Sequence, residues 1–278
     1  MVETFGERLV GRVEALGPLC VGIDPSRPAI TAWDRSDSVE GLEFFSLALL
    51  EAAVGNAAAI KPQVAHFERF AARGYQVLER LLQDARDADI LVVADVKRGD
   101  IGISNDGYAQ AWLDDSSPLR VDALTVHPYL GVQALAPFFT LAGATKRGVF
   151  VLAATSNEEG RSIQRSRSDD HELVEDQVLR SIAELNQRDD GRGSFGAVLG
   201  ATRDRPTFPL SALGGPFLVP GVGSQGASAE NVAQLFEPCP RATVLASVSR
   251  AISNAGPERA ALRDTIRRWR DDLATSLM

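Results

Sequence analysis

The stretch "ILVVADVK" at residues 90–97 decides the fold, because it is apolar for most of its length and ends in Asp95 and Lys97. A continuous apolar run is typical of a parallel strand that is covered on both faces. Similar runs recur along the chain, and they are "LCVGID" (19–24), "AAAIKP" (57–62), "ALTVHP" (123–128), "GVFVLAAT" (148–155), "FGAVLGAT" (195–202), "PFLVPG" (216–221) and "TVLASVS" (243–249). Together they predict eight buried strands.

The segments between these runs have the periodicity of amphipathic helices. In "EGLEFFSLALLEAAV" (40–54) and "ERFAARGYQVLERLLQDARDA" (68–88), apolar residues recur every three or four positions and leave one face polar. Strands that alternate with helices need parallel crossovers, so the sequence predicts an α/β fold, a (β/α)₈ TIM barrel in a single domain over 1–278. We also expect an N-terminal helix at 1–16 and a mobile loop at 156–170, which is charge-rich.

Composition narrows the class of protein. With 278 residues, 45% of them hydrophobic, the chain can bury the core of one barrel or of two modest domains. The net charge of -8 and the lack of a basic run predict no nucleic-acid partner. No stretch resembles a signal peptide or membrane span, which indicates a cytoplasmic protein without membrane contact. Cys20 and Cys239 have no CxxC neighbour, so we expect neither a zinc site nor a disulfide framework.

Polar residues follow most of the predicted strands at their carboxyl ends, where parallel barrels build their sites. Side chains alternate along a strand, so Leu91, Val93, Asp95 and Lys97 share one face. If that face points inward, Asp95 and Lys97 line the mouth of the barrel. The ends of the other runs would bring further polar residues there: Asp24, Lys61, His127, Thr155, Ser156, Thr202, Ser247, Ser249 and Arg250.

Lys61, Asp95, Lys97 and Asp100 form a candidate charged network at this mouth. A buried Lys61 ammonium needs carboxylates around it, and Asp95 at the end of the next strand and Asp100 in the turn after it are available. Fixed cations in a pocket away from water suit a reaction that develops a carbanion. Two structural alternatives remain open, since Asp95 and Lys97 could be an ordinary ion pair and Asp100 could cap a helix.

The last two strands predict a phosphate site. In "VPGVGSQGAS" (219–228), the backbone at Gly221, Gly223 and Gly226 can approach an oxyanion, and the Gln225 amide can donate to it. Arg250 and the start of a helix follow the next strand. Barrels commonly hold phosphate between these two loops, although a flexible turn without ligand would explain the glycines as well.

From about residue 17 onward, the chain resembles the orotidine 5′-phosphate decarboxylase family, most closely its type 2 bacterial branch. The resemblance rests on "GIDP" (22–25), "IKPQVAHFE" (60–68), "ADVKRGDIG" (94–102), "ATSN" (154–157), "VPGVGSQG" (219–226) and "SVSRAI" (247–252). It implies that the chain is a carboxy-lyase that converts orotidine 5′-monophosphate to uridine 5′-monophosphate in pyrimidine biosynthesis. It also implies that no cofactor or metal is needed, and that a homodimer completes each site across its interface.

The resemblance implies a role for each charged residue of the network. Lys61, Asp95, Lys97 and Asp100 match the charged tetrad of the family. Lys97 would stabilise the C6 carbanion and protonate it, and Asp100 would reach into the site of the other subunit. Asp24 would hold the ribose hydroxyls together with Lys61.

The same resemblance implies the substrate-binding residues. Ile101 would pack against the ring from across the dimer, and Ser156 would contact the pyrimidine. Ser104 stands where the family usually has threonine, which keeps the hydroxyl for a ribose contact. Gln225 and Arg250 would grip the phosphate. Pro220 and Ser249, in the same two motifs, complete the expected set.

Two other functions are compatible with parts of the sequence. Related sugar-phosphate barrels share the D-x-K-x-x-D pattern but use magnesium and an enediolate, with a carboxylate near the end of the second strand. This chain has Lys61 there, which disfavours a metal. A nucleotide-binding barrel without chemistry would not need two lysines in the pocket. His66 and His127 match no catalytic role, and we interpret both as structural histidines with satisfied hydrogen bonds.

Overall fold

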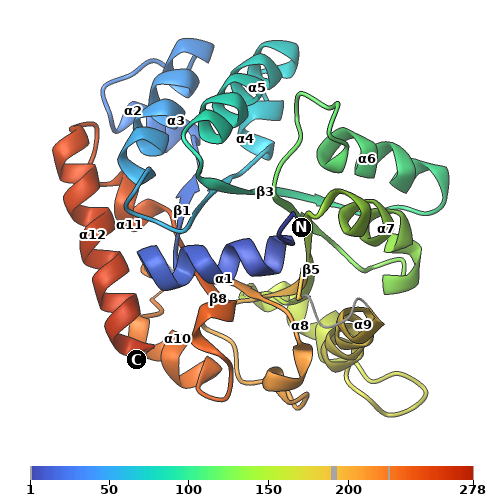
Figure 1. The fold of residues 1–278 in the computed structure, drawn as a ribbon. Coiled ribbons are helices and arrows are strands. Elements are labelled where there is room, and N and C mark those ends of the chain that lie inside the picture. Colours follow the sequence, from blue (N-terminus) through green and yellow to red (C-terminus); the bar gives the residue numbers. More distant parts are fainter. Residues whose placement is uncertain (1, 189–192, 225, 278) are drawn as a thin grey trace.

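The computed structural model describes residues 2–188, 193–224 and 226–277, and it confirms the predicted barrel. All strands are parallel and follow one another around the barrel in sequence order, and β8 pairs with β1 to close it (Figure 1). The strands are β1 Leu19–Ile23, β2 Ala59–Pro62, β3 Leu91–Arg98, β4 Ala123–Val126, β5 Gly148–Ala154, β6 Phe195–Leu199, β7 Phe217–Val219 and β8 Val244–Val248. Each of them lies in one of the apolar runs identified from sequence, except that β3 extends one residue further, to Arg98.

Helices form a ring around the strands, as the amphipathic segments predict (Figure 1). The α-helices are α1 Phe5–Leu16, α2 Arg27–Thr31, α3 Val39–Ala53, α4 Ala65–Glu68, α5 Ala71–Asp87, α6 Ile103–Leu113, α7 Ala136–Thr145, α8 Glu158–Gln164, α9 Val174–Arg188, α10 Ala229–Phe236, α11 Arg250–Ser253 and α12 Arg259–Ser276. Short 3₁₀ helices lie at η1 Val132–Leu135, η2 Leu210–Leu213 and η3 Arg241–Thr243. Among the described residues, no helix has the length and apolar character needed to cross a membrane.

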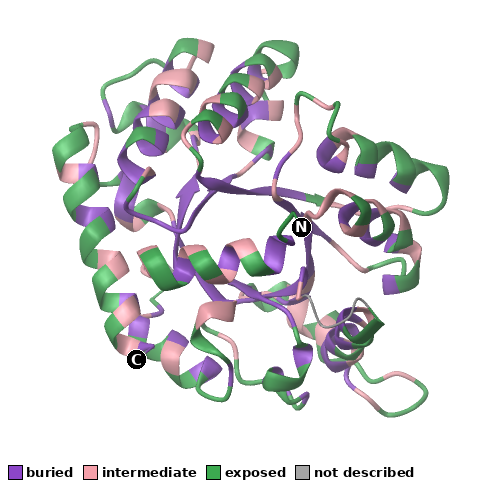
Figure 2. Cartoon of the chain, in the orientation of Figure 1, coloured by how far each residue is buried: buried purple, intermediate pink, exposed green. Residues whose placement is uncertain are grey.

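The hydrophobic core has two layers, one between strands and helices and one inside the barrel (Figure 2). The inner layer contains Leu91 and Val93 of β3, together with Phe150, Leu218 and Leu245 from other strands. The predicted inward face of β3 is therefore confirmed. Because side chains alternate along the strand, Asp95 and Lys97 continue this inward face toward the carboxyl end.

Helix α1 closes the amino-terminal end of the barrel. It begins at Phe5, later than the expected helix at 1–16, because Thr4 and Glu7 form a capping box that starts the helix there. The Phe5 ring lies inside the barrel and meets Phe150 edge-on, with 5.8 Å between ring centroids. Gly148 makes room for it, since a Cβ at that position would lie 2.2 Å from the Phe5 ring.

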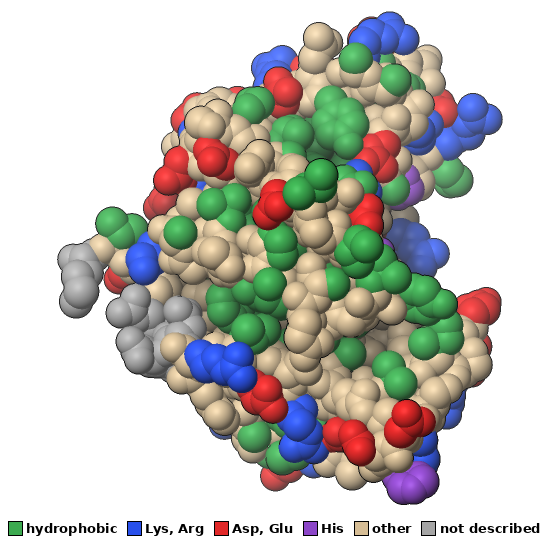
Figure 3. Space-filling model, turned by 90° about the vertical axis from the view of Figure 1, so that its right-hand side faces the viewer, with side chains coloured by type: hydrophobic (Ala, Val, Ile, Leu, Met, Phe, Trp, Pro, Cys, Tyr) green, Lys and Arg blue, Asp and Glu red, His purple; other side chains and the backbone are tan. Residues whose placement is uncertain are grey.

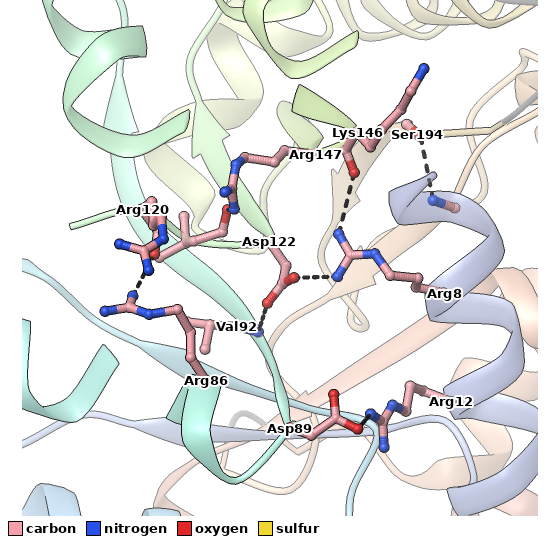
Figure 4. A network of polar contacts seen from close by, with 12 residues as sticks. Arg8, Arg12, Arg86, Asp89, Val92, Arg120, Asp122, Lys146, Arg147 and Ser194 are labelled. Carbon is pink, nitrogen blue, oxygen red and sulfur yellow. Dashed lines mark hydrogen bonds and ion pairs between the residues drawn. The ribbon is translucent and has the colours of Figure 1, made fainter. Parts of the chain in front are cut away.

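Polar contacts fasten α1 to the strand ends around it (Figure 4). The Asp122 carboxylate pairs with the Arg8 guanidinium and accepts the backbone N–H of Val92 at 2.9 Å. Arg8 also donates to the Lys146 carbonyl at 3.2 Å. With one end of the barrel closed by a helix and fastened in this way, the opposite end is the one available for a site.

The segment 156–170, expected as a mobile loop, contains helix α8. Gln164 at the end of this helix bonds back to Thr155, accepting its backbone N–H at 3.0 Å and donating to its hydroxyl at 2.7 Å. Arg161 and Arg165 reach Asp204 in the loop after β6, at 3.8 and 3.3 Å. The segment 156–170 thus forms an exposed flap that contains a helix. Its arginines pair with Glu158 in the same helix and with Asp204 in the neighbouring loop.

Candidate active site

Three of the four predicted network residues meet at the mouth of the barrel. The Lys61 ammonium, at the end of β2, donates to Asp95 Oδ2 at 2.9 Å. The Lys97 ammonium donates to the other carboxylate oxygen, Asp95 Oδ1. Lys61 and Asp95 are buried, whereas 45% of the Lys97 side chain is exposed. Asp95 therefore holds one buried lysine and one lysine that reaches toward the open end.

The charges of Lys61 and Asp95 are stable in the folded protein. Burial alone would raise the pKa of the Asp95 carboxyl, but the charges of Lys61 and Lys97 outweigh it and lower the pKa. Burial alone would lower the pKa of the Lys61 ammonium, but the negative charges of Asp95 and Asp24 outweigh it and raise the pKa. Asp95 and Lys61 accordingly remain ionised at neutral pH without any ligand.

Strand β3 bulges where it carries these residues. Ala94 lies opposite Leu124 and Arg98 lies opposite Val126, so three residues of β3 face one residue of β4. Lys97 has φ of 46°, in the left-handed region that costs a residue with a side chain about 1–2 kcal/mol. Such a conformation persists only where its surroundings hold it.

Thr125 of β4, which the sequence analysis did not identify, lies inside this bulge. Its hydroxyl accepts the backbone N–H of Lys97 at 3.0 Å and donates to Asp95 Oδ1 at 2.9 Å. The side chain is buried, with 1% of the residue exposed. A signal was present in the sequence, since Thr125 is the one polar residue within the run "ALTV".

Asp24 and Ser156 lie at the ends of β1 and β5. Asp24 Oδ1 is buried, and among the described residues it has no hydrogen-bond partner. A buried acceptor without a partner is costly, so this atom is suited to a ligand that can donate to it. Ser156 packs against Gly200 at the end of β6, where an added Cβ would lie 2.7 Å from the Ser156 nitrogen.

Asp100 does not join the other network residues within the chain. Its carboxylate accepts the backbone N–H of Ile101 at 2.8 Å, and its own N–H donates to Asn105 Oδ1 at 2.9 Å. The alternative interpretation of Asp100 as a helix cap is wrong, because α6 is preceded by Gly102 without a side-chain cap. Ile101 and Ser104 are exposed beside it.

The loops after β7 and β8 border an open pocket of 570 Å³. Arg250 and Gly223 line it together with Ser224, Gly226 and Trp269. Gly221, Gly223 and Gly226 all have positive φ, which glycine adopts at little cost. Pro220 and Ser249 are half-buried near the strand ends, and Gln225 lies outside the described residues.

The two histidines differ from expectation. His66 in α4 and His127 after β4 are each only partly buried, and neither ring makes a hydrogen bond within the described part of the chain. Burial lowers the pKa of the His66 imidazole, and the charge of Asp24 opposes this effect. The hydrogen bonds expected for these two rings are thus not formed with protein groups in the described part of the chain.

The chain also matches a known protein family over most of its length. Residues 17–265 match the model of the orotidine 5′-phosphate decarboxylase / HUMPS family. The chain belongs to this family. Among the described residues, no group of three or more His, Cys, Asp or Glu side chains is placed to hold a metal ion.

Individual proteins of this family are similar to the chain over nearly its full length. A Salinispora tropica protein named orotidine 5′-phosphate decarboxylase is 48% identical over 276 residues, which cover 99% of both chains. The Corynebacterium glutamicum protein of the same name is 44% identical, with 95% of both chains covered. A crystal structure from Streptomyces avermitilis, assigned to the same enzyme, superposes with a TM-score of 0.95 at 43% identity and covers 99% of this chain and 96% of that one.

A solved structure with lower sequence identity to this chain has the same fold. Leishmania donovani OMP decarboxylase has a TM-score of 0.73 at 29% identity, with 96% of this chain and 99% of that chain covered. The resemblance read from the motifs is therefore confirmed, and the chain is an enzyme of the orotidine 5′-phosphate decarboxylase type.

Proposed function

We propose that this protein decarboxylates orotidine 5′-monophosphate to uridine 5′-monophosphate without metal or cofactor, and that Lys97 stabilises and then protonates the carbanion at C6. The observation that carries the proposal is the placement of the Lys97 ammonium. Asp95 holds the Lys97 ammonium through an ion pair, while 45% of the Lys97 side chain remains exposed at the barrel mouth. A cation in this position can meet a ligand while it stays paired with Asp95.

The chemistry follows from where the electrons go. When the C6–carboxyl bond breaks, CO₂ leaves and the electron pair stays on C6 in the plane of the ring, where the ring π system cannot absorb it. An adjacent ammonium stabilises this charge and then transfers its proton to C6. Lys97 thereby becomes a neutral amine and takes up a proton from solvent before the next turnover.

The remaining residues of the mouth would bind the substrate. Asp24, with its unpartnered buried oxygen, would accept a ribose hydroxyl beside Lys61. Ser156 would contact the pyrimidine. Arg250 and the glycine-rich loop around the 570 Å³ pocket would hold the phosphate, together with Gln225, Pro220 and Ser249. The flap at 156–170 would move to admit and enclose the substrate.

The active form would be a cytoplasmic homodimer in which the partner completes each site. Large apolar residues are exposed next to Asp100, namely Ile101 at 61%, Ile103 at 88%, Tyr129 at 76% and Leu130 at 50%. Asn105 ties this part of the surface together, because its amide donates to both Asp100 and Ala134 backbone carbonyls. Figure 3 views this side of the molecule and shows hydrophobic side chains toward its notched edge. An exposed patch of this kind marks an interface, and a second copy would bring Asp100 and Ile101 to the neighbouring mouth.

The proposal is tested by incubating the purified protein with orotidine 5′-monophosphate, with and without a chelator. Substrate loss is followed by absorbance and uridine 5′-monophosphate is identified by chromatography. We expect the same rate in both samples. Strict magnesium dependence, or no turnover by a folded sample, would contradict the proposal and favour the sugar-phosphate alternative.

The matched pair of variants for this assay is Lys97→Ala and Lys146→Ala. Lys146 lies at the closed end of the barrel, where only its backbone carbonyl contacts Arg8 (Figure 4). We expect Lys97→Ala to lose several orders of magnitude in kcat, because cation and proton source vanish together. Lys146→Ala should remain near the wild-type rate.

A further inference from the structure

We propose that Thr125 is a positioning residue for the reaction, because its single hydroxyl holds both the Asp95 carboxylate and the backbone of Lys97. The inference rests on the role proposed for Lys97. Thr125 does not reach the barrel mouth itself, since only 1% of the residue is exposed. Its effect on turnover would therefore pass through the two residues that it contacts.

The hydroxyl is used in both directions. It accepts the Lys97 N–H at 3.0 Å and donates its own proton to Asp95 Oδ1 at 2.9 Å. This uses the one donor of a threonine and one of its acceptor sites. Oδ1 is also the oxygen that receives the Lys97 ammonium. Thr125 therefore closes a ring that joins the backbone and the side-chain tip of the same lysine.

The bulge in β3 explains why a side chain is needed at this point. With Ala94 paired to Leu124 and Arg98 paired to Val126, the residues between them have no regular partners on β4. The Thr125 hydroxyl replaces the missing backbone acceptor for Lys97. It also holds Lys97 at its left-handed φ of 46°, a conformation that a residue with a side chain rarely adopts.

Loss of the Thr125 hydroxyl should change the direction of the Lys97 side chain more than the binding of substrate. The Lys97 side chain leaves the backbone from this strained position, so a change in φ would swing the ammonium away from the axis of the mouth. Asp95 would remain paired with Lys61 through its other oxygen at 2.9 Å. The pocket proposed for the phosphate lies at the loops after β7 and β8, and Thr125 is not among the residues that line it.

The experiment compares Thr125→Val, which keeps the shape but removes the hydroxyl, with Thr125→Ser, which keeps the hydroxyl. For Thr125→Val we expect kcat to fall about 10- to 100-fold, with KM and the Kd of uridine 5′-monophosphate changed by less than about threefold. Thr125→Ser should recover most of the lost kcat. Thr265→Val is the matched control, since Thr265 is a buried threonine on α12, and its kcat should equal that of the wild type.

Two results would overturn the proposal. One is a kcat of Thr125→Val within about twofold of the wild type. The other is a loss of product affinity in proportion to the loss of kcat, which would indicate general damage to the barrel. Thr125→Ala serves where the valine variant does not fold, and the same expectations apply to it. Lys97→Ala, assayed beside them, separates the two proposals, because an active Lys97→Ala rejects the mechanism, whereas an inactive one with a normal Thr125→Val rejects only the inference about Thr125.

Discussion

At the scale of single residues, the proposed site has two kinds of charged group. Lys61 and Asp95 are paired within the protein, whereas Arg250 is exposed at the edge of a pocket. Lys61 and Asp95 are buried and paired, so their positions do not depend on substrate. Arg250 is exposed at the edge of its pocket. Within the described residues, its guanidinium forms no ion pair with a carboxylate. A cation without a carboxylate partner among these residues is available for an anion.

Arg250→Ala should therefore weaken the substrate through its phosphate alone. We expect KM for orotidine 5′-monophosphate to rise about 10- to 100-fold, the cost of losing charge-assisted hydrogen bonds. The affinity for orotidine, which lacks the phosphate, should stay within about twofold. Steady-state kinetics and competition binding measure the two quantities. Arg263→Ala, an exposed arginine of α12, is the control. Equal losses for both ligands would rule out a phosphate contact.

At the scale of elements, we expect helix α1 to contribute to the stability of the protein and not to its catalytic rate. Its Phe5, Leu9 and Val13 side chains fill the barrel from the end opposite the mouth. Its polar side is fastened by Arg8 to Asp122 and by Gly6, whose N–H donates to the Ser194 hydroxyl at 3.3 Å (Figure 4). The helix therefore completes the inner core without approaching Lys97.

Phe5→Ala should destabilise the protein by about 3–5 kcal/mol, the usual cost of removing a fully buried phenylalanine. The kcat measured well below the unfolding temperature should remain near that of the wild type. Urea unfolding and steady-state assays test the two halves of this prediction. Arg12→Ala provides the control on the exposed side of α1, where the pair with Asp89 is largely solvated, and its unfolding midpoint should hardly move. A strong loss of kcat in folded Phe5→Ala would mean that the two ends of the barrel are coupled.

At the scale of the whole molecule, one chain brings together three of the four charged residues of the proposed site. Asp100 lies beside exposed apolar residues and is separated from the pair that Asp95 forms with Lys61 and Lys97. A homodimer through this surface would bury the apolar side chains and supply a carboxylate from each copy to the other.

Mixing two inactive variants tests this arrangement. Homodimers of Lys97→Ala and of Asp100→Ala should each be nearly inactive. In a mixed dimer both changes fall into one site, so dissociation and random reassociation of equal amounts should restore about a quarter of wild-type turnover. Mass analysis counts the mixed dimers. If they form and the sample stays as inactive as its parents, Asp100 acts within its own chain or not at all.

The sequence by itself determined the barrel and the inward face of β3. Eight apolar runs, each followed by polar residues, and the alternation of side chains in "LVVADVK" depend on neighbours along the chain, and both expectations are confirmed. The positions of Lys61, Asp95 and Lys97 at one mouth follow from the same local rules, because parallel strands align their carboxyl ends.

Only the tertiary structure decided how these residues are held. The bulge opposite Thr125, the left-handed backbone of Lys97 and the turn of Asp100 away from Lys61 depend on which residue of one strand faces which residue of the next. That register is set by pairing between residues such as Asp95 and Thr125, which are 30 positions apart in the chain, so no pattern within either strand contains it. The closing of the barrel by α1 and the helix in the segment 156–170 were likewise decided by contacts with distant residues, Asp122 and Asp204 among them.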